Sequence, residues 1–184
     1  MTDDRIKPWK TLGKKTLTDT PIFSIALVER QSPQGLDAEF FLAEMPDWVN
    51  VVAVTPDDHL VMVRQYRHGT DSITLEIPGG IVDEGESYVD AARRELREET
   101  GYEAESFVQI GAVEPNPAFQ NNTCATILAL GARATAETDF DEHEELVVEL
   151  HELDEVERMI RDGQIRHALV VAGIYHYLSE ATQT

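Results

Sequence analysis

Three glutamates in one short segment have the chemistry and the spacing of a ligand set for a divalent cation. Glu95, Glu98 and Glu99 are three and four positions apart, so an α-helix carries all three on one face. Like charges at this spacing weaken an exposed helix by roughly 0.2–0.5 kcal/mol. Cations between the carboxylates remove that cost, and hard oxygen ligands without cysteine favour Mg²⁺, or Mn²⁺, over zinc. A bare cluster of this kind is more often a solvated helix face, so the surrounding pattern must decide.

The charge of the whole chain bears on what such a site would do. Fifteen Lys and Arg against 35 Asp and Glu give a formal net charge of −20. This balance argues against a nucleic-acid partner, because backbone-driven binding needs a basic surface. A substrate that carries phosphates is accommodated only where metal ions or local arginines reverse the field. The Gly79-Gly80 pair before the glutamates lets the backbone come close, so that a main-chain carbonyl can join the ligands.

A helix over residues 87–100 must hold the glutamates. Ser87 and Asp90 form a capping box at its start, and Gly101 suits the cap at its end. Alternation, turn composition and helical periodicity predict the remaining elements. Strands are expected at 22–30, 37–45, 49–55, 59–66, 74–77, 107–113, 123–130 and 146–150, and further helices at 153–161 and 165–178. One helix among strands and a pair of helices at the end predict either an α+β domain or a layered α/β/α domain, with a mixed sheet in both cases.

We place a domain boundary near Pro46-Asp47. Residues 1–47 are expected to form a small N-terminal antiparallel β-hairpin domain, and residues 48–184 the main domain. A two-stranded hairpin is marginal on its own, so it must pack on the main body or on another subunit.

The composition also bears on the cellular compartment. A single cysteine, Cys124, excludes an intrachain disulfide and a Cys-rich zinc site, and its apolar surroundings predict a buried side chain. No segment approaches the roughly 18 apolar residues of a membrane span, and the first residues lack the apolar core of a secretory signal. We therefore expect a cytoplasmic protein without a membrane partner.

The segment from Gly80 to Tyr102 resembles a complete Nudix box. It reads Gly80-x5-Glu86-x7-Arg94-Glu95-Leu96-x-Glu98-Glu99-x-Gly101-Tyr102, with no departure at the defining positions. The resemblance implies a Nudix-type α/β/α sandwich that uses Mg²⁺ to hydrolyse nucleoside diphosphates linked to another moiety.

The same resemblance implies roles for individual residues. Glu95 and Glu99 would be metal ligands, with Glu98 contributing directly or through water. Gly79 would offer its carbonyl to the metal, and Arg94 would orient the glutamates. Glu86 would brace the turn into the helix. Gly80 and Gly101 would also be structural positions of the motif.

Outside the box the chain resembles the ADP-ribose and nucleoside-diphosphate-sugar pyrophosphatases. The resemblance rests on the N-terminal segment, the run from Arg64 to Gly69, the approach from Leu75 to Gly80, and the C-terminal helices around Gly163-Gln164-Ile165. It implies that Arg67 binds the phosphates and that Glu76 lies near the nucleotide or the terminal ribose. The alternative for Arg67 is a surface arginine at the end of a strand, and the alternative for Glu76 is a residue on the exposed side of a strand.

An acidic segment after residue 136 is the expected source of a general base. By position Glu144 best matches the loop glutamate of this branch, and Glu142 and Glu145 remain alternatives. The N-terminal segment implies a homodimer, because similar segments in this branch exchange between subunits and help to form the substrate pocket.

The features that should select the substrate are less specific. Asn116-Pro117-Ala118 departs from the Ser-Pro-Gly common in ADP-ribose enzymes, which leaves the sugar open. Trp9, Trp48 or Phe119 could stack on a base, although an aromatic side chain in a small domain is more often part of the core.

The glutamate pattern and the two resemblances together imply Mg²⁺-dependent hydrolysis of the pyrophosphate bond in nucleoside diphosphate sugars such as ADP-ribose. The products would be a nucleoside monophosphate and a sugar phosphate. The alternatives are another Nudix substrate, a nucleoside triphosphate or a dinucleoside polyphosphate, and a non-catalytic nucleotide-sugar sensor. The intact glutamate set argues against the sensor.

Overall fold

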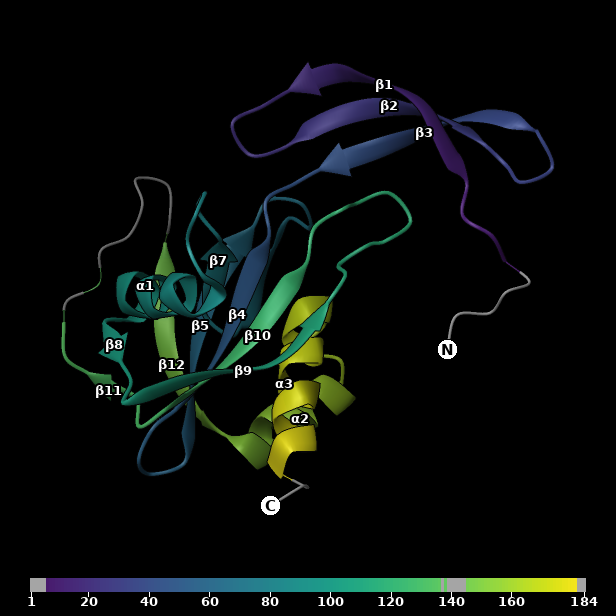
Figure 1. The fold of residues 1–184 in the computed structure, drawn as a ribbon. Helices are drawn as coiled ribbons and strands as arrows, with labels where there is room; N and C mark the ends of the chain where they lie inside the picture. The colour runs from purple at the N-terminus through teal and green to yellow at the C-terminus, as the bar shows by residue number, and fades with distance from the viewer. Residues whose placement is uncertain (1–5, 137, 139–144, 182–184) are drawn as a thin grey trace. The chain divides into compact units, whose positions relative to one another are not determined.

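The chain divides into two structural units (Figure 1). One consists of Met1–Pro46 and Glu114–Asn122, and the other of Asp47–Val113 and Thr123–Thr184. The computed structural model describes residues 6–136, 138 and 145–181.

The first unit is built on an antiparallel sheet of three strands. Its order is β1 (Lys10–Asp19), β2 (Ser24–Gln31), β3 (Asp37–Glu44). The two strands expected from the sequence are confirmed, but β1 was missed. Its lysines and threonines are almost all exposed, so β1 lacks the alternation of apolar and polar residues that reveals a half-buried strand.

The main sheet of the second unit is mixed. Its central order is β12 (Leu146–Glu152), β5 (His59–Arg67), β4 (Trp48–Val54), β10 (Cys124–Leu130), β9 (Ser106–Val113). The β4–β10 pair is parallel, whereas the other pairs along this path are antiparallel. The expected mixed sheet is thus confirmed.

Alternate residues of the central strands pack against helices on opposite faces. Val51 and Val61 contact the cluster around Leu96 of α1 (Tyr88–Thr100) on one face. On the other face Val52 and Met62 pack with buried residues of α2 (Leu153–Arg161) and α3 (Ala168–Ala181). This is the predicted α/β/α sandwich. Helix α3 begins at Ala168 rather than at Ile165, which is buried ahead of it.

Two short strands split the main sheet near its middle. Strand β5 pairs with β4 only at Ala53 and Val54. Its later part pairs with β6 (Ser72–Glu76), while the start of β4 pairs with β7 (Gly79–Ile81). Strand β7 was not predicted, because a three-residue strand that contains two glycines carries no periodic signal. The split matters because the chain between β6 and β7 leads directly into the Gly79-Gly80 pair.

Smaller features complete the second unit. Two-residue strands β8 (Tyr102–Glu103) and β11 (Arg133–Ala134) pair antiparallel beyond the end of α1. Cys124 is fully buried as predicted, and this burial raises the pKa of its thiol to about 12. None of the described helices has the length and apolarity to cross a membrane.

A histidine held between two carboxylates ties β12 to α2. His151 Nε2 lies 3.0 Å from a carboxylate oxygen of Glu149, and Nδ1 lies 3.0 Å from one of Glu155. Ionised carboxylates only accept hydrogen bonds, so both ring nitrogens must donate and the ring must be an imidazolium. Arg64 on β5 also donates twice to Glu149, whose pKa falls to about 2, mainly because of that pair.

This arrangement predicts a stability contribution that depends on pH. Burial lowers the pKa of His151, but the hydrogen bonds to Glu155 and Glu149 outweigh burial and leave the pKa above its ordinary 6.5. The contribution is therefore complete below the unfolded-state pKa and is lost as the pH rises through the higher folded-state pKa. NMR titration should give a His151 midpoint above 6.5. Glu155→Gln, which removes one anionic acceptor, should lower it. A wild-type midpoint at or below 6.5 contradicts the assignment.

Candidate active site

Helix α1 is fixed at both ends by its own caps. The Ser87 hydroxyl accepts a hydrogen bond from the Asp90 amide at 3.1 Å, and Gly101 takes the left-handed conformation with φ 70°. The Gly101 amide donates to the carbonyl of Arg97 at 2.8 Å. These caps set the register that turns Glu95 and Glu99 toward β7.

The glycine pair brings the backbone of β7 against the carboxylates of α1. The Gly79 amide donates to Glu99 Oε2 at 2.9 Å. A Cβ on Gly79 would overlap the carbonyl oxygen of Val49, and a Cβ on Gly80 would overlap the Glu95 carboxylate. Glu99 is buried, and the Glu95 side chain is only 14% exposed. The Glu95 carboxylate therefore occupies space that a side chain at position 80 would take, and glycine at position 79 lets β7 lie against the Val49 backbone.

Arg94 connects the loop before α1 with the glutamates on the helix. It donates to both oxygens of Glu86, at 3.1 and 2.9 Å, and to the carbonyl of Ile81 at 2.9 Å. Its other terminal nitrogen donates to Glu95 at 2.8 Å and to Glu98 at 3.3 Å. The bonds to Glu86, foremost, raise the pKa of Arg94, so it stays charged and offsets the repulsion among the carboxylates.

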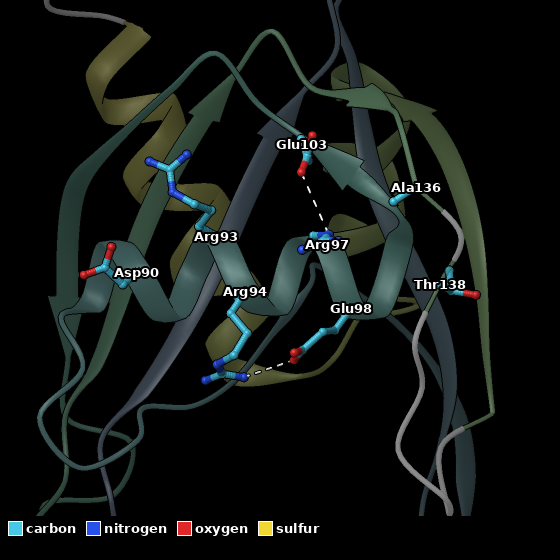
Figure 2. Close-up of a pocket in the computed structure, with 8 residues that line it drawn as sticks. All are labelled: Asp90, Arg93, Arg94, Arg97, Glu98, Glu103, Ala136 and Thr138. Carbon is cyan, nitrogen blue, oxygen red and sulfur yellow. Dashed lines mark hydrogen bonds and ion pairs between the residues drawn. The ribbon is translucent and has the colours of Figure 1, made fainter.

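Glu98 is the most exposed of the three glutamates, at 44% of its side chain. Figure 2 shows Arg94 and Glu98 reaching toward one another from α1, at the edge of a cavity of about 650 Å³. Ala136 and Thr138, at the start of the acidic segment, line the same cavity. The described residues at the start of that segment therefore lie around the same cavity as Glu98.

A second charged group lies on the α1 face of the β5–β6 hairpin. Val61 of β5 packs under α1, so alternation puts Arg67 on the same face. Glu76 of β6 pairs in register with Val63 and shares that face. Arg67 donates to the two oxygens of Glu76 at 2.8 and 2.7 Å. The glutamates of α1 and the guanidinium of Arg67 thus face the same side of the split sheet.

Comparison with known proteins assigns this arrangement to a family. A model of the NUDIX domain matches residues 46–172, which include the glutamate motif and the split sheet. The chain belongs to the Nudix family. The predicted membership and the predicted Nudix fold are both confirmed, and the protein is a Nudix pyrophosphohydrolase.

Individual relatives of this Nudix chain extend over almost its whole length. It is 30% identical over 181 residues to an ADP-ribose pyrophosphatase of Bacillus subtilis (strain 168), covering 95% of this chain and 98% of the relative. It is 33% identical over 181 residues to a methanol dehydrogenase activator of Bacillus methanolicus, with 94% and 97% covered. A crystal structure of an ADP compounds hydrolase shares the fold, with a TM-score of 0.86 over 98% of each chain at 23% identity.

The residues on the face of α1 fit the divalent cation that Nudix enzymes generally use. Among the described residues, no three acidic, histidine or cysteine side chains converge into a group that could hold a metal ion. Carboxylate oxygens of Glu95 and Glu98 accept hydrogen bonds from Arg94, and one of Glu99 accepts a hydrogen bond from the Gly79 amide. The donors are nonetheless all oxygen, and glycine at position 80 lets the Glu95 carboxylate lie directly against the backbone, where a Cβ would overlap it. Such a set suits Mg²⁺ or Mn²⁺, provided that Arg94 yields part of its contacts.

The remaining candidate residues belong to other elements of the fold or lie outside the described residues. Glu142 and Glu144 are outside them, whereas Glu145 is described and exposed just before β12. Trp9 packs edge-on against Phe40 at 5.5 Å between ring centroids, within the first unit. Phe119 also belongs to the first unit and is partly exposed, and Trp48 is half-buried in β4 of the second.

Two residues near Glu76 were missed by the sequence analysis. Thr74 donates to Glu76 Oε1 at 2.5 Å, and its place two positions before Glu76 on a strand could have revealed the shared face. His167, just before α3, has Nδ1 4.0 Å from Glu76 Oε2. It is 91 positions away in the chain, and no local pattern connects the two.

Proposed function

We propose that this Nudix enzyme hydrolyses the diphosphate bond of nucleoside diphosphate sugars, with ADP-ribose or a related ADP-sugar as the substrate. The products are a nucleoside monophosphate and a sugar phosphate. Mg²⁺ is the proposed cofactor, and Mn²⁺ can replace it because both prefer oxygen ligands. The proposed compartment is the cytoplasm, where the buried thiol of Cys124 stays reduced.

The placement of two groups on one face of the split sheet carries this proposal. Glu95 and Glu99 lie against the Gly79-Gly80 backbone, and Arg67 lies on the same face. A guanidinium matches a phosphate through two parallel hydrogen bonds. Carboxylates and a guanidinium on one face suit a diphosphate that is bound by cation and arginine together.

Hydrolysis requires an activated water and a neutralised diphosphate. Glu95, Glu98, Glu99 and the Gly79 carbonyl would hold a divalent cation, which would supply positive charge for the phosphates and make nearby water more acidic. Glu144 is the proposed general base, and Glu142 and Glu145 are the alternatives. Ala136 and Thr138, at the start of their segment, line the cavity at Glu98, which supports the proposal of a base from this segment.

The names of two relatives bear on the choice among the possible substrate classes. An ADP-ribose pyrophosphatase matches 95% of this chain, a share too large to leave out the first unit. Nucleoside triphosphates and dinucleoside polyphosphates are the competing substrates, since the glutamate motif alone does not choose the leaving group. The relative named as a methanol dehydrogenase activator has the same length of match, so the substrate needs a direct assay.

A substrate panel tests the proposed function. With Mg²⁺ present, the wild type should turn over ADP-ribose or another ADP-sugar faster than nucleoside triphosphates and dinucleoside polyphosphates, and chelation should abolish turnover. Glu99→Gln should lower kcat by roughly 10²-fold or more, because it removes a charged ligand while keeping the volume. Glu105→Gln is the matched control, since Glu105 is exposed and its nearest guanidinium nitrogen is 3.9 Å away.

Each arm of this assay has an outcome that contradicts the proposal. Preference for a triphosphate or a dinucleoside polyphosphate overturns the substrate class. A Glu99→Gln enzyme with near-normal turnover removes Glu99 from the metal site. Hydrolysis in ¹⁸O-labelled water, with mass spectrometry of both products, identifies which phosphorus the water attacks.

The first unit supports a homodimer. Its sheet buries few apolar side chains, among them Ala26, Val28 and Ala43, whereas Phe41 is 65% exposed. A sheet with so small a core is marginal by itself, and an exposed apolar surface of this kind indicates an interface. Strand β1 also carries three lysines in a chain of net charge −20, which favours an acidic partner such as a second copy.

Light scattering tests the proposed dimer. The wild type should have twice the chain mass of 20.6 kDa, and Phe41→Glu should shift it toward the monomer because a charge would be buried in the interface. Tyr175→Glu, at an equally exposed aromatic on α3, should leave the mass unchanged. A wild-type mass of 20.6 kDa at assay concentrations contradicts the dimer.

A further inference from the structure

The carboxylate of Glu76 is enclosed by protein. Only 2% of the residue is exposed, although it stands at the end of β6 where the sheet splits. A substrate hydroxyl or phosphate therefore has little access to this carboxylate. By contrast, 43% of the Arg67 side chain is exposed.

Three donors satisfy the two oxygens of Glu76. Arg67 contributes Nε at 2.8 Å and Nη2 at 2.7 Å, and the Thr74 hydroxyl contributes a third bond at 2.5 Å. Burial opposes ionisation, but the bonds from Arg67 and Thr74 outweigh it, so the pKa of Glu76 lies below its ordinary value. Glu76 is therefore a fixed anion whose acceptor sites face this chain's own residues.

The chain before α3 provides a further neighbour. His167 Nδ1 is buried, has no hydrogen-bond partner among the described residues and lies 4.0 Å from Glu76 Oε2. Arg67, Thr74 and His167 thus surround the carboxylate from β5, β6 and the segment ahead of α3. A two-point bond to an anchored carboxylate fixes both the position and the plane of a guanidinium.

We infer that Glu76 is a positioning residue that acts through Arg67: it holds the guanidinium at the orientation in which its exposed part meets a substrate phosphate, and it makes no substrate contact itself. The inference rests on the proposed function, since it requires a phosphorylated substrate on the α1 face. It replaces the expectation that Glu76 lies against the nucleotide or the ribose.

A double-mutant cycle distinguishes action through Arg67 from direct contact. Glu76→Gln keeps the volume but loses the charge, and it should reduce kcat/KM for the best nucleotide sugar by roughly 10- to 100-fold, mostly through KM. Arg67→Ala should cost at least as much. In the Arg67→Ala background Glu76→Gln should have no additional effect, because the group through which it acts is gone.

Two further measurements separate positioning from a general loss of structure. Mn²⁺ affinity, measured by electron paramagnetic resonance without substrate, should be unchanged in Glu76→Gln, and Glu105→Gln should leave all parameters at wild-type values. The melting temperature shows whether each variant is folded at the assay temperature. If Glu76→Gln is unfolded there, Thr74→Val replaces it in the cycle, because it removes a donor to the same carboxylate.

The possible outcomes decide between the inference and the proposed function. Additive losses in kcat/KM from Arg67→Ala and Glu76→Gln overturn the inference and indicate a direct contact of Glu76 with substrate. A Glu76→Gln loss confined to kcat also overturns it. A wild type that hydrolyses no nucleotide sugar overturns the proposed function instead, and that result is seen before any variant is made.

Discussion

The close approach of the Gly79-Gly80 backbone to α1 is the constraint on which the site depends. A side chain on either glycine would overlap protein atoms, the Val49 carbonyl in one case and the Glu95 carboxylate in the other. Because both positions are glycine, β7 can pair with β4 directly beneath the helix. Glu95 and Glu99 then lie half-buried or buried against the backbone instead of extending into water.

That constraint concentrates negative charge, and the surrounding residues compensate for it. Arg94 bonds to Glu86, Glu95 and Glu98, and the Gly79 amide bonds to Glu99. These contacts hold the glutamates in place, and the same oxygens suit a hard divalent ion. A chain of net charge −20 can thus meet a diphosphate, provided that a cation at α1 and the guanidinium of Arg67 supply the positive charge.

The parts of the fold that follow a period were predictable from the sequence. Helix α1 and its caps follow from the spacing of Ser87, Asp90 and Gly101, and the central strands follow from apolar runs bounded by turns. Strand β1 was not predictable in this way, because an exposed strand has no buried side to alternate with. The split between β4 and β5 depends on which strands pair, and pairing is a tertiary property.

The candidate site shows the same limit. The sequence indicated Arg67 and Glu76 separately, but only the β5–β6 register shows that the two side chains share a face and bond to one another. The contact with His167 crosses 91 positions and depends on how the chain before α3 packs. Motif spacing therefore predicts groups on one element, whereas the partners that orient them come from folding.

Manganese binding to Gly80→Ala tests the central claim most directly. The added methyl group must displace the Glu95 carboxylate, so Mn²⁺ affinity measured without substrate should fall by roughly 10- to 100-fold. Gly69→Ala is the matched control, because a Cβ at Gly69 meets nothing within 4 Å, and its affinity should equal that of the wild type. If folded Gly80→Ala binds Mn²⁺ as tightly as the wild type does, the glycine backbone and the glutamates of α1 do not form the metal site.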